Sequence, residues 1–225
     1  MAKPAKYDFI NIHDHGALPH DGVFTIENLM IHEARYPEEL RGIAYSAGIH
    51  PWEVEKETLE DEYARLRELC LKENVIAVGE AGYDKLKGPE LLLQDEAFRM
   101  QVALSEELGK PLFIHCVRAW DDLLHIHKKI APAMKWIIHG FRGKAQLASQ
   151  LIDKGFFLSP WVEWAIRPDS AVILRSIPRE RLFLETDGFD IGIEPVYKVV
   201  AEHLGITSEE LKKQLWENYM YVFDS

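Results

Sequence analysis

The sequence has few of the features that mark secreted or membrane proteins. Only two cysteines, Cys70 and Cys116, occur in 225 residues, which argues against a disulfide framework. No apolar run approaches the roughly 20 residues of a membrane span. The N-terminal stretch MAKPAKYDF lacks the apolar core of a signal peptide. We therefore expect a cytoplasmic protein with no membrane partner.

Basic residues are also scarce. Lysine and arginine number 26 against 37 aspartates and glutamates, a formal charge of -11. A surface of this charge repels polyanions, so a broad electrostatic grip on a nucleic-acid duplex is not expected, although a local cationic site could still bind phosphate. Low-complexity tracts and Ser/Gly-rich linkers are absent, and nothing indicates an obligate protein partner. We predict a single domain spanning residues 1–225.

What the sequence does contain is a regular alternation of short apolar runs and longer amphipathic segments. The runs predict eight strands, at residues 9–13, 23–30, 43–50, 75–80, 111–115, 136–139, 155–159 and 182–187. The amphipathic segments predict helices at residues 57–73, 90–108, 121–129, 144–154 and 165–176, with a last helix from Thr207 or Ser208. Eight such units favour an α/β fold, a (β/α)8 TIM barrel. About ten residues separate the first two runs, too few for a crossover helix, so either the first helix is missing or residues 23–30 are not the second strand. We expect the first helix to be missing.

Ionisable residues follow the apolar runs at their carboxyl ends. They are His13, His15, His50, Glu80, His115, His139 and Asp187. The carboxyl ends of barrel strands form the face on which active sites are built. A second H-x-H, at His125 and His127, lies in a segment of helical period, where residues i and i+2 do not face each other. We interpret that pair as a solvated helix surface.

Histidines and carboxylates without a thiolate suit zinc, manganese, nickel, iron or magnesium. The six predicted ligands are His13, His15, Glu80, His115, His139 and Asp187. Six are more than one catalytic zinc needs, so two divalent ions sharing a bridging carboxylate, Glu80, are expected. Such a pair would hold a bridging hydroxide as nucleophile, and Asp187 would orient it and accept its proton.

Seven ordered motifs resemble the TatD family of metal-dependent hydrolases, TIM barrels related to the amidohydrolases. The motifs are INIHDHG, AGIHPWE, VGEAGYD, KPLFIHC, IIHGFRG, FLETD and the Q-x3-F of QDEAF, and the closing ENYMYVF is similar to the family's last helix. The resemblance implies one metal on His13, His15, Glu80 and Asp187, and the other on Glu80, His115 and His139. It also implies that His50 reaches a substrate phosphate, and that Asp84 and Glu185 hold the imidazole rings through hydrogen bonds.

The chain departs from the family pattern at several positions. Asn11 replaces the usual aspartate before the first histidine, which would change how the ligands are held rather than remove a metal. The usual arginine after the fourth motif is shifted by one residue to Arg118. Arg142 replaces a small residue and could clamp a phosphate, whereas Lys85 and Lys87 more often belong to a solvated loop. Trp52, Trp161 and Trp164 follow strand ends, where they could cap the core or stack on a base.

Three functions remain open from the sequence. The first is a two-metal hydrolase of phosphodiesters acting on DNA ends, because the resemblance implies a deoxyribonuclease that works from the 3′ end. The second is an amidohydrolase-type reaction on an ester, lactone or amide, since the same nucleophile attacks carbonyl carbon. The third is a binding barrel that keeps its metals only for stability.

Overall fold

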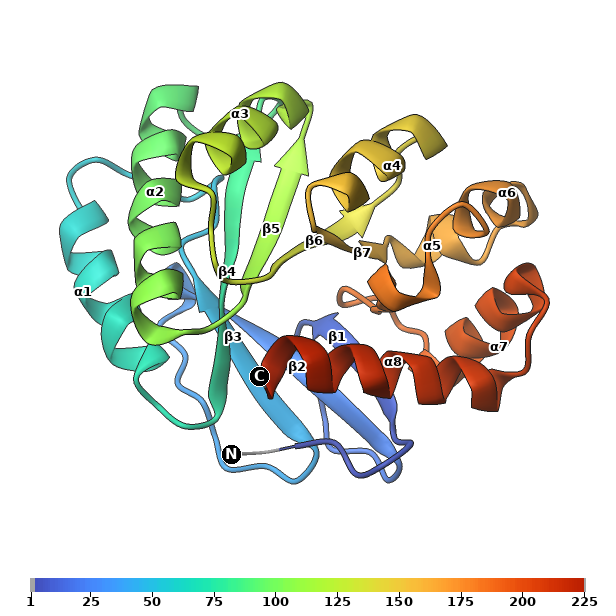
Figure 1. Ribbon diagram of the computed structural model, residues 1–225. Coiled ribbons are helices and arrows are strands. Elements are labelled where there is room, and N and C mark those ends of the chain that lie inside the picture. The colour runs from blue at the N-terminus through green and yellow to red at the C-terminus, as the bar shows by residue number, and fades with distance from the viewer. Residues whose placement is uncertain (1–2, 225) are drawn as a thin grey trace. The chain divides into compact units, whose positions relative to one another are not determined.

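The computed structural model describes residues 3–224. Seven strands form one sheet in the order of the chain, from β1 to β7 (Figure 1), and the neighbours run parallel. The strands are β1 (Phe9–Asp14), β2 (Val23–Met30), β3 (Ile43–Gly48), β4 (Val75–Asp84), β5 (Leu112–Val117), β6 (Trp136–Phe141) and β7 (Phe157–Pro160). Parallel strands in chain order are what the alternating sequence pattern predicts.

Helices separate most of the strands. They are α1 (Leu59–Cys70), α2 (Leu91–Leu108), α3 (Trp120–Ile130), α4 (Ala145–Asp153), α5 (Val162–Ala165), α6 (Ala171–Leu174), α7 (Ile193–Leu204) and α8 (Ser208–Phe223). Short 3-10 turns lie at η1 (Ile31–Glu33), η2 (Pro168–Ser170) and η3 (Arg179–Arg181). The chain passes from β1 to β2 without a helix, which confirms the prediction that the first helix is missing.

The chain comprises two compact units. The first unit contains Met1–Glu27, Leu40–Ala44 and Ile138–Ser225, and the second contains Asn28–Glu39 and Tyr45–Ile137. The single domain expected from the sequence stays a prediction. Each unit contains its own share of the predicted ligand residues.

In the second unit, α2 packs against β4, α1 contacts both of them, and α3 lies against β5 (Figure 1). All ten residues of β4 are buried, as expected of a parallel strand covered on both faces. The strand β4 extends four residues beyond the predicted end at Glu80, to Asp84. Gly82 pairs with His115 of β5 in this extension. A side chain at Gly82 would collide with the carbonyl oxygen of His115, so glycine is required there.

In the first unit, residues 182–187 take the place of the predicted eighth strand. Leu182 forms a single parallel bridge with Leu158 of β7. On the other side, the Ile12 N–H donates to the Leu184 carbonyl at 2.9 Å and the Asp187 N–H donates to the His13 carbonyl at 3.1 Å. The prediction of a regular strand here is wrong, although the segment is hydrogen-bonded to a strand on each side. The segment leaves the extended conformation at Asp187, whose φ is 51°.

The predicted helix at residues 165–176 is also wrong in form. The region contains the short helices α5 and α6, separated by a 3-10 turn that begins at Pro168. Proline removes a backbone donor and biases the preceding residue, Arg167, toward extended backbone. The sequence analysis missed α7, although the buried positions Val196, Tyr197 and Val200 have helical spacing.

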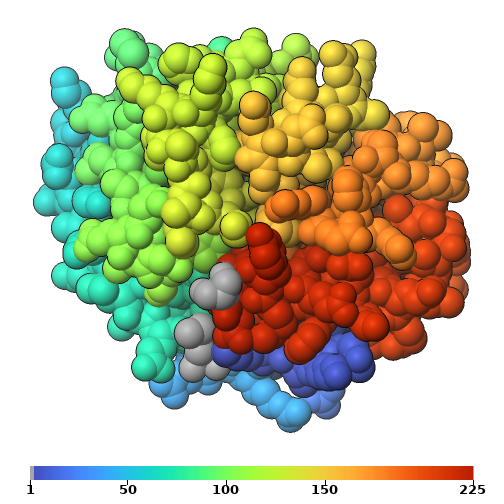
Figure 2. Space-filling view, in the orientation of Figure 1, coloured from blue at the N-terminus to red at the C-terminus, as the bar shows by residue number. Residues whose placement is uncertain are grey.

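The last helix begins as predicted. The Thr207 hydroxyl accepts from the Glu210 N–H, and Glu210 accepts from the Thr207 N–H, which completes a capping box. Further along α8, the Asn218 side-chain amide donates to the carbonyls of Arg179 and Leu182. The helix α8 contacts β1 and covers the surface beside the N-terminal segment (red against blue in Figure 2).

Tyr197 of α7 provides a test of how β1 is held. Its buried hydroxyl donates to the Ile10 carbonyl at 3.0 Å and accepts from the Ile10 N–H at 3.1 Å. Tyr197→Phe is expected to lower the free energy of unfolding by about 1–3 kcal/mol, because two buried backbone groups lose their partner. Urea denaturation measures this loss. Tyr221→Phe, at a tyrosine that is 53% exposed, is the control and should change stability by less than about 0.5 kcal/mol. Equal effects of the two substitutions would contradict the assignment.

Candidate metal-binding site

The first unit brings together three predicted ligands from the two ends of the sequence. The donor atoms of His13, His15 and Asp187 all lie within 4.8 Å of one another. The Asp187 Oδ1 atom lies 3.7 Å from the His13 Nε2 atom and 3.6 Å from the His15 Nε2 atom. His13 is fully buried, whereas the side chains of His15 and Asp187 are 27% and 22% exposed. The cluster is therefore open to solvent on one side.

Two neighbouring residues hold the Asp187 turn. The Asn11 Oδ1 atom accepts from the Thr186 N–H at 3.0 Å, and the Asn11 amide donates to the Thr186 hydroxyl at 2.6 Å. The Asp14 Oδ1 atom accepts from the backbone N–H groups of His15 and Gly188 at 2.9 and 2.8 Å. Asn11 was predicted only to change how the ligands are held, and Asp14 was not among the predicted site residues. The aspartate between the two histidines was the available signal.

His139, at the carboxyl end of β6, also belongs to the first unit. The donor atoms of His139, Glu185 and Asp187 lie within 4.8 Å of one another. The centroid of the His139 ring lies 4.3 Å from that of the His13 ring. Glu185 is fully buried, and burial raises the pKa of its carboxyl to about 8, although His139 nearby opposes the shift. The Glu185 Oε1 atom lies 3.9 Å from the His139 Nδ1 atom and accepts from the Gly140 N–H at 2.7 Å.

The second unit contains a separate cluster of His50, Glu80 and His115. All three are buried, and their donor atoms lie within 4.8 Å of one another. The Glu80 Oε1 atom lies 3.1 Å from the His50 Nε2 atom and 2.7 Å from the His115 Nδ1 atom. The structure thus places His50, which was expected to reach substrate, together with two predicted metal ligands.

The surroundings fix the geometry of this second cluster. Asn28, which the sequence analysis missed, accepts from the Glu80 N–H and from the Ser46 hydroxyl, both at 3.1 Å. Asp84, predicted to hold an imidazole ring, lies 3.2 Å from the second ring nitrogen of His115. Burial opposes ionisation of Asp84. Hydrogen bonds from Trp52, the Leu86 N–H and His115 outweigh it, so the pKa of Asp84 lies below its usual value.

The donor set of each cluster fits a divalent cation. Ligands about 2.1 Å from one ion lie roughly 3–3.5 Å apart, close to the spacing of the imidazole and carboxylate atoms in the first unit. In the second unit, the Glu80 carboxylate lies at hydrogen-bond distance from the rings of His50 and His115. A cation bound there would replace the proton that a ring nitrogen shares with the carboxylate. The absence of thiolate from both sets favours zinc, manganese or a similar ion over a soft metal.

The predicted cationic residues lie outside both clusters. The Arg142 guanidinium is positioned over the Trp161 ring, 4.6 Å from its centroid. Lys85 pairs with Asp122 at 2.5 Å, and Lys87 lies 3.4 Å from the centroid of the Trp52 ring. These lysine partners agree with the interpretation of loop charges.

The second H-x-H motif lies on α3, as expected. His125 is exposed. His127 is half-buried, however, with its ring 4.9 Å from that of Trp136. The interpretation of a solvated pair therefore holds for His125 alone.

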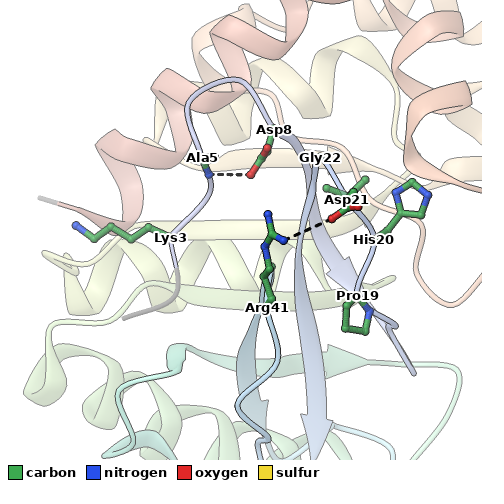
Figure 3. A pocket seen from close by; sticks show the side chains of 10 residues that line it. Lys3, Ala5, Asp8, Pro19, His20, Asp21, Gly22 and Arg41 are labelled. Atoms are coloured by element: carbon green, nitrogen blue, oxygen red, sulfur yellow. Dashed lines mark hydrogen bonds and ion pairs between the residues drawn. The ribbon is translucent and has the colours of Figure 1, made fainter.

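A cavity of about 470 Å³ lies elsewhere in the first unit, and its lining includes Asp8, His20, Asp21 and Arg41 (Figure 3). Asp8 precedes β1, whereas His13 and His15 lie at the carboxyl end of that strand. Arg41 points toward Asp21, and the two are paired at 3.7 Å. Lining charges of both signs without a cluster of ligands make this cavity a poor metal site.

Comparison with known proteins agrees with the site chemistry. A family model described as TatD related DNase matches residues 25–224. The metal-dependent hydrolase YabD of Bacillus subtilis, whose function is uncharacterized, is 35% identical over 205 residues, covering 83% of this chain and 79% of its own length. The chain belongs to the TatD family of metal-dependent hydrolases. The resemblance inferred from the motifs is thereby confirmed.

Other TatD proteins extend the comparison. The 3′-5′ ssDNA/RNA exonuclease TatD of Pantoea ananatis is 33% identical over 148 residues, covering 63% of this chain and 56% of its own. The crystal structure of the Escherichia coli TatD homologue YjjV superposes with a TM-score of 0.78 at 21% identity, covering 98% of this chain and 100% of its own. A TatD protein of Entamoeba histolytica gives 0.76 at 19%, covering 99% of both chains.

These structural neighbours confirm the predicted α/β TIM-barrel fold class. Membership of the family makes the chain a metal-dependent hydrolase. Among residues 3–224, no helix is long and apolar enough to cross a membrane.

Proposed function

We propose that this TatD-family hydrolase cleaves phosphodiester bonds at single-stranded DNA ends, from the 3′ end, with two divalent ions. The observation that carries the proposal is that imidazole and carboxylate donors gather within 4.8 Å in each unit of a chain that belongs to a family of metal-dependent hydrolases. The Pantoea ananatis relative, named as an ssDNA/RNA exonuclease, supports the choice of substrate.

The proposed ligands are His13, His15, His139 and Asp187 in the first unit, with Glu80 and His115 in the second. Zn, Mn, Mg, Ni or Fe could fill these positions. When bound, two such ions would lower the pKa of a shared water and neutralise charge on a phosphate.

The chain's own residues would carry the proton and orient the substrate. Asp187, partly exposed beside two histidines, would orient the attacking water and accept its proton. Glu80, held through its backbone N–H by Asn28, would hold metal through its carboxylate together with His115. His50, next to Glu80, would hold a phosphate oxygen. Asn11, Asp84 and Glu185 would hold the loop and the rings in place.

A substrate panel with added Mn²⁺, Zn²⁺ or Mg²⁺ tests the proposal. Single-stranded oligonucleotides with free 3′ ends should be shortened faster than oligonucleotides with blocked 3′ ends, and faster than sites inside long duplexes. Cutting of closed circular duplex without activity at free ends would contradict it. Faster turnover of carboxylic esters or lactones than of any phosphodiester would favour the amidohydrolase-type reaction instead.

Arg142 is proposed to contact the phosphate. Its side chain is exposed, and a guanidinium donates two parallel hydrogen bonds to a phosphate. Arg142→Ala is expected to raise the KM for an oligonucleotide by about 5- to 20-fold at low salt and to leave kcat and bound metal unchanged. Steady-state kinetics at two salt concentrations measures this. Arg167→Ala, at another exposed arginine of the first unit, is the control, and equal KM changes for the two variants would contradict the role.

A further inference from the structure

In the first unit, Arg142 lies beside two partly or fully exposed aromatic side chains that the proposed chemistry does not use. We call Arg142, Trp161 and Phe189 the aromatic platform. The Arg142 guanidinium lies 4.6 Å from the Trp161 ring centroid. The Trp161 and Phe189 rings meet edge to face, with centroids 5.8 Å apart and an interplanar angle of 69°. The platform thus combines one cation with two aromatic rings.

The backbone fixes this platform next to the ligand residues of the same unit. Arg142 follows His139 by three residues, and Phe189 follows Asp187 by two. The Trp161 N–H donates to the carbonyl of Phe141, the residue before Arg142, at 3.0 Å. The Phe189 N–H donates to the Thr186 carbonyl, also at 3.0 Å. Turns tied to the ligand-bearing strands therefore carry the platform.

The exposure of these side chains argues against a purely structural role. Phe189 is 38% exposed, Trp161 is half-buried and Arg142 is exposed. Twelve other aromatic residues of the described chain have less than 2% of their surface exposed, Phe141 and Phe183 among them. An aromatic face open to solvent beside a guanidinium matches a nucleotide, because the base stacks on the ring and the phosphate pairs with the cation.

We propose that the aromatic platform binds the terminal nucleotide of a single strand. This assignment rests on the proposed phosphodiesterase function and names the part of the substrate that the site recognises. The nucleobase stacks against Phe189, and Arg142 pairs with the phosphate. Trp161 is a positioning residue that holds the guanidinium on one side and supports the Phe189 ring on the other. A paired base at a duplex end is already stacked, so the platform favours single strands.

Binding of metal-free protein tests the platform separately from cleavage. The probes are two 5′-fluorescein oligodeoxynucleotides in EDTA, one unmodified and one with two abasic sites at its 3′ end, measured by fluorescence anisotropy. Wild-type protein should bind the unmodified probe about 5- to 100-fold more tightly. Phe189→Leu should abolish that difference, Phe189→Tyr should keep it, and the control Tyr221→Leu, at an exposed aromatic of α8, should have no effect.

The cationic and positioning roles give different patterns. Arg142→Ala should weaken binding of both probes by a similar factor. Trp161→Leu should weaken both and also reduce the preference for a base, with partial rescue by Trp161→Phe. Equal wild-type affinity for the two probes, or an unchanged preference in Phe189→Leu, would overturn the platform. If the protein preferred the unmodified probe but cleaved no oligonucleotide in added metal, the proposed function alone would be overturned. If it cleaved oligonucleotides but bound the two probes equally, the platform alone would be overturned.

Discussion

His13→Ala and His115→Ala are each expected to lower the bound metal by about one equivalent per chain, from two in the reconstituted wild-type protein. The two substitutions remove one ligand from the cluster of each unit. Losing a residue that only orients a ligand already reduces metal affinity by about 10- to 100-fold, so loss of a ligand should do at least as much. Elemental analysis after dialysis at a fixed free-metal concentration measures the loss.

The control for these variants is His125→Ala. It removes an exposed histidine of the other H-x-H motif, on α3, and should leave the metal content unchanged. His50 lies with Glu80 and His115, so His50→Ala is added to the series. A loss of metal in this variant would make His50 a ligand, whereas full metal content would make it a residue that only contacts substrate. Full metal content in both His13→Ala and His115→Ala, with native circular dichroism, would contradict the proposed ligand set.

Asp187→Asn is expected to reduce kcat by about 10²- to 10⁴-fold, the usual range for loss of a general base. Asparagine has nearly the same shape and keeps one oxygen as a ligand, but it cannot accept a proton. The turn should stay in place, because the Asp187 backbone N–H donates to the His13 carbonyl and Asn11 holds Thr186. Single-turnover rates in saturating metal measure the chemical step without the effect of weaker metal binding.

Asp190→Asn, at an exposed aspartate three residues further along, is the matched control and should retain wild-type rates. If Asp187→Asn were as active as wild type at every metal concentration, Asp187 would have no role in proton transfer. If neither the wild type nor the variant hydrolysed any substrate of the panel, the alternative of a metal-stabilised binding barrel would be favoured.

Much of the fold was determined by local pattern. Apolar runs of strand length alternating with amphipathic segments were sufficient for the parallel sheet and the helices α1 to α4, because these signals reside in neighbouring residues. The absence of a helix between β1 and β2 followed from the small number of residues between these two strands. The start of α8 followed from Thr207 and Glu210, which form the capping box. The sequence motifs were likewise sufficient to identify the family.

Other features depend on contacts that sequence spacing does not encode. Residues 182–187 looked like a strand, yet most of their hydrogen bonds with β1 and β7 lie outside a regular ladder. Pro168 interrupts the helix predicted at residues 165–176, because proline has no backbone N–H to donate to a helical hydrogen bond, whatever the spacing of the apolar residues around it. The helix α7 was missed although its buried positions follow a helical period.

The same division applies to the site. The sequence by itself determined which residue types could bind metal, because imidazole and carboxylate groups recur at the carboxyl ends of its apolar runs. The motifs also implied that Asp187 groups with His13 and His15. Only the tertiary structure decided that His50 lies against Glu80, and that Asp14 and Asn28 hold the backbone of the ligand residues. The physical reason is that a donor's identity is local, whereas its direction depends on turns and hydrogen bonds between segments far apart in the chain.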